Sequence, residues 1–372
     1  MPSQTTYLNA ASHGLPDETV RERMLAHIRR ESEAGPFVAA REVEEEVNAV
    51  RQKAADLIGA DTAQTAFAQT TMSGWSAAVS ALPLKGSRIL VTPDEWGECA
   101  QILSQLGAPD GLRLEVMPTT QGGDIDLAAL KTTLDDDVAA ISMPMVSSLR
   151  GRRLPVEEVG SLPRPDHCFF IVDGAQALGQ LPVDVKRINC DIFAATARKW
   201  LRSARGTAIL YVRPSALDRM AQLPILDATG TPSGNEPPDI RRFESFDYVV
   251  ALRLALGTAI DVLNRAGIAA VGDTIRRHAL HVRDRVARAG LQLADPEEPQ
   301  SGITSFFLPG GAVERVSQCL DAEDIVVKFP PFSDEPMQPA PSDGTVLVRV
   351  SPHVYNQADE IDALFDRLDA TV

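Results

Sequence analysis

The chain has 372 residues, enough for a large hydrophobic core and for one large domain with a smaller partner domain. Its formal net charge is −15, and so acidic a surface repels nucleic acid and anionic membranes, so neither is an expected partner. No apolar run reaches the ~18 residues of a membrane span, and residues 1–6 lack the features of a secretion signal, so we expect a cytoplasmic protein.

The N-terminal part of the chain is predicted to be a loop followed by two helices. Residues 6–14 are loop-like, and a helical pattern covers residues 17–34. A second helical pattern covers residues 43–58, with apolar side chains at helical spacing (Val43, Val47, Val50, Ala54 and Leu57).

From residue 88 onward, short apolar runs alternate with helix-like stretches. This alternation is typical of an α/β fold with a mostly parallel sheet covered by helices on both faces. In such sheets ligands bind at the carboxyl ends of the strands. The predicted strands are Arg88–Thr92, Leu112–Met117, Ala139–Met143, His167–Val172, Asp191–Ala195 and Ile209–Val212.

The C-terminal part begins after a stretch, residues 226–239, whose glycines and prolines predict a loop. Helices are expected over residues 248–266 and 270–289, and the chain closes on a helical pattern at 356–368. We therefore place a large domain at residues 15–245. Residues 246–372, together with the N-terminal residues 1–14, form a predicted small α/β domain.

Two strand-end residues carry the strongest chemical signal. The buried run Phe170–Val172 leads directly into Asp173, and Lys199 follows the next apolar strand. Their separation suits neighbouring strands joined by a crossover, so both groups are expected in one crevice. A carboxylate and an amine so placed suit pyridoxal phosphate (PLP), since the amine binds the aldehyde and the carboxylate keeps the pyridine nitrogen protonated. For an isolated pair, a surface lysine and a capping aspartate remain the plainer alternative.

Four stretches resemble segments of class V aminotransferases and cysteine desulfurases, which are PLP enzymes. The matching stretches are YLNAASHG (7–14), FIVDGAQALGQLPVDV (170–185), DIFAATARKWLRSARGTAILYVRP (191–214) and VRVSPHVYNQADEID (348–362). They resemble, in this order, the family's substrate loop, its cofactor-aspartate segment, its lysine segment and its carboxylate-binding segment. The resemblance implies the type I fold of PLP-dependent transferases, with a seven-stranded sheet in the large domain, and a homodimer.

The resemblance also implies roles around the cofactor ring. Lys199 would bind PLP as a Schiff base and serve as general base, and Asp173 would pair with the ring nitrogen. Gln176 would approach the ring hydroxyl, and Ser148 falls where desulfurases have an asparagine near that hydroxyl. Trp96 falls where the family often has a histidine stacked on the ring, although a buried core tryptophan is the alternative.

Further residues match the family's phosphate and substrate contacts. Thr71 and Met72 lie in the loop-to-helix segment that would hold the phosphate, because a helix start offers free N–H groups. Thr196 and Arg198 flank the lysine where the family has other phosphate ligands. The substrate contacts implied by the resemblance are Arg349, for the α-carboxylate, and Asn9 and His13 in the N-terminal loop; His13 is equally well a loop surface residue.

Two departures from the family pattern bear on function. Desulfurases carry a nucleophilic cysteine shortly before the C-terminal arginine, whereas residues 329–344 are rich in proline and contain no cysteine. Cys319 lies upstream in a helical pattern, so a persulfide-forming desulfurase is disfavoured. Asp247 stands where a threonine often reaches the partner subunit's phosphate, which puts that contact in doubt. No C-x-x-C pair is present, and no metal site is predicted.

Within the family the chain most resembles the C–S lyases of ergothioneine biosynthesis, through PDEWGE (93–98), SSLRG (147–151) and ARKW (197–200). We therefore expect β-elimination from a cysteine S-conjugate or its sulfoxide. An aminotransferase, or an epimerase resembling isopenicillin N epimerase, uses the same residues and stays open, as does an inactive PLP-fold binding protein. The roles of Arg150 and Arg242 and the leaving group are not decided by the sequence.

Overall fold

The structure is a computed structural model of the whole chain, and it describes residues 5–108, 111–220, 240–245, 247–296 and 298–369. The predicted loop at residues 226–239 lies outside the described residues.

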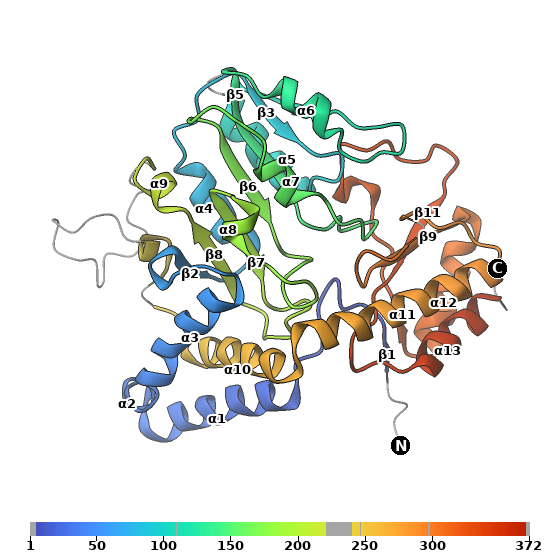
Figure 1. Ribbon diagram of the computed structural model, residues 1–372. Helices are drawn as coiled ribbons and strands as arrows, with labels where there is room; N and C mark the ends of the chain where they lie inside the picture. Colours follow the sequence, from blue (N-terminus) through green and yellow to red (C-terminus); the bar gives the residue numbers. More distant parts are fainter. Residues whose placement is uncertain (1–4, 109–110, 221–239, 246, 297, 370–372) are drawn as a thin grey trace.

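A seven-stranded sheet forms the centre of the molecule (Figure 1). Its order is β2-β8-β7-β6-β5-β3-β4, and β8 runs antiparallel to the other six strands. The predicted mostly parallel seven-stranded sheet is therefore confirmed. The strands are β2 (Thr65–Ala68), β3 (Arg88–Val91), β4 (Arg113–Val116), β5 (Val138–Pro144), β6 (Phe169–Asp173), β7 (Ile192–Thr196) and β8 (Ala208–Val212).

Alternate residues of each central strand face two different hydrophobic cores. On β6, Phe170 and Val172 belong to one core, whereas Phe169 and Ile171 belong to the other. This period-2 alternation, with every residue of β6 buried, is the pattern of a strand covered on both faces. The sheet edge beyond Asp173 is therefore held by packing on two sides.

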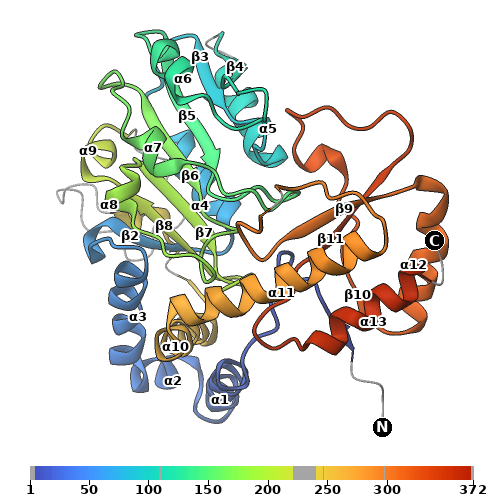
Figure 2. The same cartoon turned by 45° about the vertical axis from the view of Figure 1, so that its right-hand side comes forward.

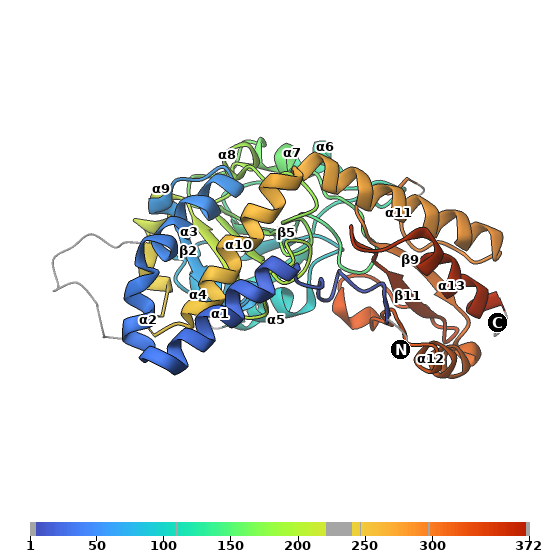
Figure 3. The same cartoon turned by 90° about the horizontal axis from the view of Figure 1, so that it is seen from below.

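Helices cover both faces and extend the large domain. One face carries α4 (Thr71–Ser80) and α5 (Gly97–Gly107), and on the other α1 (Glu18–Ala34), α3 (Glu44–Leu57) and α10 (Val250–Ala266) lie together (Figure 3). The remaining short helices of this part are α2 (Pro36–Glu42), α6 (Leu127–Thr133), α7 (Val156–Gly160), α8 (Val185–Ile188) and α9 (Pro214–Leu217), with 3-10 turns η1 (Thr62–Gln64) and η3 (Ile240–Phe243).

The C-terminal part forms a separate small core. Helix α11 (Ile268–Arg288) runs from the large sheet to the antiparallel pair β9–β11 (Figure 2). The N-terminal strand β1 joins this part by pairing with β10. Its elements are β1 (Thr6–Tyr7), β9 (Thr304–Leu308), η4 (Gly310–Ala312), α12 (Val313–Ala322), β10 (Ile325–Val326), η5 (Phe332–Asp334), β11 (Val346–Val350) and α13 (Ala358–Asp369).

The domain division at residue 245 stays a prediction. Helix α10, which follows that position, packs against α1 and α3 of the large domain. Among the described residues no single helix has the length and apolar character to cross a membrane. The pair α10 and α11 meets the criterion jointly, by length and composition, but it is bent by 82°.

Candidate active site

Asp173 and Lys199 are brought to one place by neighbouring parallel strands. Asp173 ends β6 and pairs with Ala194 of β7, and Lys199 follows three residues after β7 ends at Thr196. The N-terminal loop closes over the lysine, since the Gly14 N–H donates to the Arg198 carbonyl at 2.8 Å. A Cβ on Gly14 would lie 2.2 Å from the Lys199 carbonyl oxygen, so this contact requires glycine.

The surroundings of Lys199 favour its neutral amine. Burial lowers the lysine pKa to about 7; the negative charge of Asp173 opposes this shift, and Arg198 and Arg349 reinforce it. Burial also raises the pKa of Asp173, against a 2.7 Å hydrogen bond from the Ala175 N–H and the charge of Lys199. An amine with a pKa near 7 has a substantial unprotonated fraction at neutral pH, which suits both attack on an aldehyde and acceptance of a proton.

Gln176 is fixed in one orientation. Its Oε1 accepts a 2.9 Å hydrogen bond from the Trp200 indole, which can only donate. Its Nε2 therefore faces the other way and donates to the Ala11 carbonyl at 3.1 Å and to the Ser148 hydroxyl at 3.3 Å. The structure thus brings Gln176 and Ser148 together, as their predicted shared role at the ring hydroxyl requires.

Arg349 joins this group from β11 of the small domain. It is 4% exposed, and it donates to the Ser148 carbonyl at 2.8 Å and to the Ser12 hydroxyl at 2.7 Å. Its Nε–H is buried and has no hydrogen-bond partner within the described part of the chain. Burial lowers the pKa of Arg349 to about 10, and an unsatisfied buried guanidinium N–H favours a carboxylate ligand.

The start of α4 offers a set of free donors. Thr70 caps the helix by accepting from the Ser73 N–H at 2.9 Å. The Thr71 and Met72 N–H groups have no hydrogen bond to the rest of the described chain. The Thr71 hydroxyl is likewise buried and unpartnered. Free N–H groups, a hydroxyl and the positive end of the helix dipole suit a phosphate.

The other predicted contacts divide between the lysine and the N-terminal loop. Thr196 is buried, and its hydroxyl donates to the Thr207 carbonyl at 3.4 Å. Arg198 donates to the Ser12 carbonyl, so at least one of its N–H groups is hydrogen-bonded to the N-terminal loop. Asn9 has a buried Oδ1 with no hydrogen-bond partner among the residues that the structure describes. Burial and the nearby charges of Arg198 and Arg205 lower the pKa of His13.

Trp96 lies at the start of α5 and is partly buried against the core that contains Phe169 and Ile171. It is therefore not a fully buried core tryptophan. Its indole Nε1 donates to Glu98 Oε2 at 3.4 Å.

Several buried groups of the site were not predicted from the sequence. Glu335 is 1% exposed and accepts from the Ser147 hydroxyl at 2.6 Å and from the Leu149 N–H at 3.0 Å. Glu95 is fully buried, and neither of its carboxylate oxygens accepts a hydrogen bond from the described residues. Ser12, which contacts Arg349, was also missed. The partners of Ser12 and Glu335 lie 337 and 188 residues away, so no local motif indicates them.

These residues fit PLP. The unprotonated Lys199 matches the aldehyde, and Asp173 matches a protonated ring nitrogen. The unpartnered Thr71 hydroxyl and the free N–H groups beside it match the phosphate. The unsatisfied Nε–H of Arg349 matches an α-carboxylate.

Comparison with known proteins gives a consistent result. A family model described as Aminotransferase class-V matches residues 6–364. A cysteine desulfurase of Serratia proteamaculans is 28% identical, over 96% of this chain and 91% of that protein. A probable hercynylcysteine sulfoxide lyase of Mycobacterium tuberculosis is 26% identical, over 99% and 90%. The solved structure of the cystine C–S lyase C-DES with cysteine persulfide superposes with a TM-score of 0.86 at 21% identity, covering 99% of this chain and 98% of that one.

Proposed function

Because the chain belongs to the class V aminotransferase family and is therefore a PLP-dependent enzyme of fold type I, we propose that it is a C–S lyase. The proposed reaction is β-elimination from a cysteine S-conjugate or its sulfoxide. The Cβ–S bond breaks, the sulfur group leaves with the bonding electrons, and the three-carbon remainder is hydrolysed to pyruvate and ammonia.

The side chains of the site divide the work of this reaction. Bound PLP supplies an electron sink for the substrate's α-carbon. The guanidinium of Arg349 holds the α-carboxylate, and Nζ of Lys199 takes the α-proton. Asp173 would place a negative charge beside the ring nitrogen and so keep that nitrogen protonated. Gln176 and Ser148 would hold the ring hydroxyl.

The observation that carries the proposal is the segment that precedes Arg349. In this chain the stretch contains no thiol, and Glu335 fixes it by its hydrogen bonds to Ser147 and Leu149. Among the cysteines, Cys99, Cys168 and Cys190 are buried, and burial raises the pKa of each thiol. Cys319 belongs to α12 in the small domain. A segment that is held in place and lacks a nucleophilic thiol favours elimination over persulfide formation, because elimination needs no thiol.

One relative supports elimination, whereas the Serratia proteamaculans relative is described as a cysteine desulfurase. The Mycobacterium tuberculosis relative, matched over almost the whole chain, is described as a probable sulfoxide lyase. The name of C-DES likewise describes a C–S lyase, although the structural likeness supports only the fold. We further propose that the enzyme acts in a pathway similar to ergothioneine biosynthesis. We also propose that it is a cytoplasmic protein.

The proposal also includes a homodimer. Phe37 on α2 is 86% exposed, and Leu25 and Ile28 on α1 are 38% and 43% exposed. Large apolar side chains of this kind on adjacent helices favour association with a second copy. Helices α1 and α2 lie next to each other in Figure 3.

Pyruvate release tests the proposed reaction. A panel of cysteine S-conjugates and their sulfoxides is incubated with the PLP-loaded enzyme and no keto acid. We expect pyruvate from at least one sulfoxide, and at least a 100-fold loss of that rate in Lys199→Ala, because general-base catalysis contributes about 10²–10⁴-fold. No pyruvate from any conjugate, with amino transfer to an added keto acid instead, would contradict the proposal.

A further inference from the structure

The turn at residues 147–151 orients the arginine of the site. Ser148, its second residue, accepts hydrogen bonds from Arg349 at the carbonyl oxygen (2.8 Å) and at the hydroxyl (3.2 Å). The Gln176 amide donates to the same hydroxyl at 3.3 Å. Both oxygens of Ser148 thus bind one end of the Arg349 guanidinium, and the Nε–H at its other end stays unpaired within the described segments. The direction in which Arg349 offers that Nε–H therefore depends on the position of Ser148.

Glu335 binds the residues on both sides of Ser148. Its Oε1 accepts from the Ser147 hydroxyl at 2.6 Å and from the Leu149 N–H at 3.0 Å. Glu335, Ser147 and Leu149 are all buried, with exposed fractions of 1% or less. A lost hydrogen bond at this place is not readily replaced by water. Removal of the Glu335 carboxyl group therefore frees the chain before and after the carbonyl that orients Arg349.

Glu335 is itself held against the loop that precedes α5. The Gln338 amide donates to Asp94 Oδ1 at 2.9 Å and to Glu335 Oε2 at 3.5 Å. Burial and the charge of Asp94 raise the pKa of Glu335 to about 8, against the charge of Arg150, so the carboxyl group is mostly neutral at pH 7. A neutral carboxyl group still has a carbonyl oxygen that accepts two hydrogen bonds. Glutamine has the same acceptor, so it can replace Glu335 here.

We propose that Glu335 is a positioning residue for recognition of the substrate's α-carboxylate. It acts through Ser148, whose two oxygens set the orientation of the Arg349 guanidinium. The hydrogen bonds of Glu335, and not its charge, carry this role. The inference rests on the proposed role of Arg349 and is independent of which bond of the substrate breaks.

A matched pair of ligands isolates recognition of the α-carboxylate. S-Methyl-L-cysteine carries the carboxylate, and 2-(methylthio)ethylamine is the same molecule without it. Both are titrated by calorimetry into the PLP-loaded Lys199→Ala protein, which lacks the base that would start turnover. We expect S-methyl-L-cysteine to bind about tenfold more tightly or better, because an ion pair with a buried arginine adds to its affinity.

Variants in the Lys199→Ala background assign part of this preference to Glu335. Glu335→Leu removes the acceptor and should raise the Kd of S-methyl-L-cysteine about tenfold, while the Kd of the amine stays within about twofold. Glu335→Gln keeps Oε1 and should leave both Kd values within about threefold. Glu314→Leu makes the same exchange at an exposed position on α12 and should change neither. Equal changes for the two ligands in Glu335→Leu, or equal impairment in Glu335→Gln, would overturn the inference.

Ser147→Ala provides the test if Glu335→Leu does not fold. It removes one of the two hydrogen bonds that Glu335 Oε1 accepts, so the Kd of S-methyl-L-cysteine alone should rise about threefold. An unchanged Kd would overturn the inference. Equal affinities of the Lys199→Ala parent for the two ligands would overturn the role of Arg349 and this inference together. The absence of pyruvate from the wild-type enzyme would count against the lyase alone.

Discussion

Lys199 combines a strand-end position with surroundings that keep its amine neutral. Because burial lowers its pKa to about 7, the reactive unprotonated form predominates above that pH rather than above ~10.4, the value for an exposed lysine. The rate at which the apoprotein takes up PLP, followed by absorbance, should therefore rise with pH and level off between about 7 and 8. A rate that continues to rise to pH 10 would contradict the perturbed lysine.

Glu95 is a buried carboxyl group whose ionisation opposes folding. Burial raises its pKa from 4.5 to about 8, and the charge of Asp173 adds to the shift. Between these two values the folded state keeps a proton that the unfolded state has lost, so this group's contribution to stability falls as pH rises through the window.

The isosteric change Glu95→Gln tests this dependence. The variant lacks the titration, whereas Glu335, whose pKa is also about 8, remains in both proteins. Relative to wild type, the variant should gain stability progressively from pH 5 to pH 9, by on the order of a few kcal/mol. Urea unfolding at a series of pH values measures the difference, and a difference that does not change with pH would contradict the assignment.

Residues within continuous segments were the ones predictable from the sequence. Asp173, Gln176 and Lys199 stand in strand-end stretches whose apolar runs are visible in the chain. Ser12 and Glu335 escaped prediction because each meets its partner only after folding, at sequence separations of 337 and 188 residues. A buried carboxyl group such as Glu95 cannot be recognised from the apolar periodicity of the sequence.

At the scale of elements, long helices and buried strands followed their predicted patterns within a few residues. Helices α1, α3, α10, α11 and α13 all have apolar faces long enough to show their period. Strand β2 (Thr65–Ala68) was missed because two of its four residues are alanine, which is depleted in strands. Helix α2 was missed because it spans only seven residues between Gly35 and Val43.

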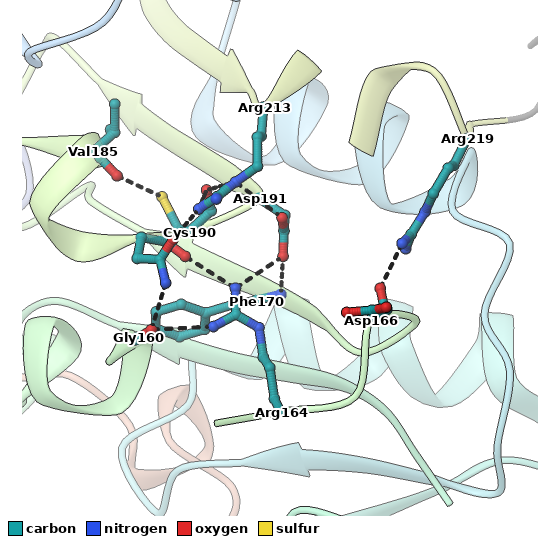
Figure 4. Close-up of polar contacts among 10 residues, drawn as sticks. Gly160, Arg164, Asp166, Phe170, Val185, Cys190, Asp191, Arg213 and Arg219 are labelled. Carbon is teal, nitrogen blue, oxygen red and sulfur yellow. Dashed lines mark hydrogen bonds and ion pairs between the residues drawn. The ribbon is translucent and has the colours of Figure 1, made fainter. Parts of the chain in front are cut away.

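A polar cluster anchors the ends of β6 and β7 that lie away from Lys199 (Figure 4). Asp191 is 9% exposed and accepts from the Phe170 N–H at 2.8 Å. It also pairs with Arg213 at 3.1 Å and with Arg164 at 3.4 Å. The carboxylate therefore joins the beginnings of two neighbouring strands to two flanking segments.

Removing this carboxylate should destabilise the sheet without touching the chemistry. Asp191→Ala removes the acceptor of the Phe170 N–H and the carboxylate paired with both arginines, which keep carbonyl acceptors at Gly160, Asn189 and Cys190, so the free energy of unfolding should fall by about 1–3 kcal/mol. Asp218→Ala, at an exposed position beyond α9, should change it by less than about 0.5 kcal/mol. Urea unfolding measures both, and a loss in Asp191→Ala no larger than the control would contradict the anchoring role.

At the scale of the whole molecule, the proposed dimer depends on the apolar surface of α1 and α2. Phe37→Glu should place a charge in that interface and raise the dimer dissociation constant at least tenfold, which sedimentation velocity can measure. Leu280→Glu is a matched control, since Leu280 is 40% exposed on α11, away from α2 in Figure 3. Identical behaviour of the two variants would contradict an interface at α2.

The central claim is that this PLP enzyme breaks a C–S bond by elimination and needs no cysteine nucleophile. The most direct test is carbon-13 NMR of the products formed from a cysteine S-conjugate sulfoxide labelled at the β-carbon, and from L-cysteine labelled in the same way. We predict labelled pyruvate from the sulfoxide, with one ammonia per pyruvate, and no alanine from either substrate. Labelled alanine from L-cysteine, formed as fast as pyruvate from the sulfoxide, would contradict the claim, because that product requires transfer of sulfur to a nucleophile.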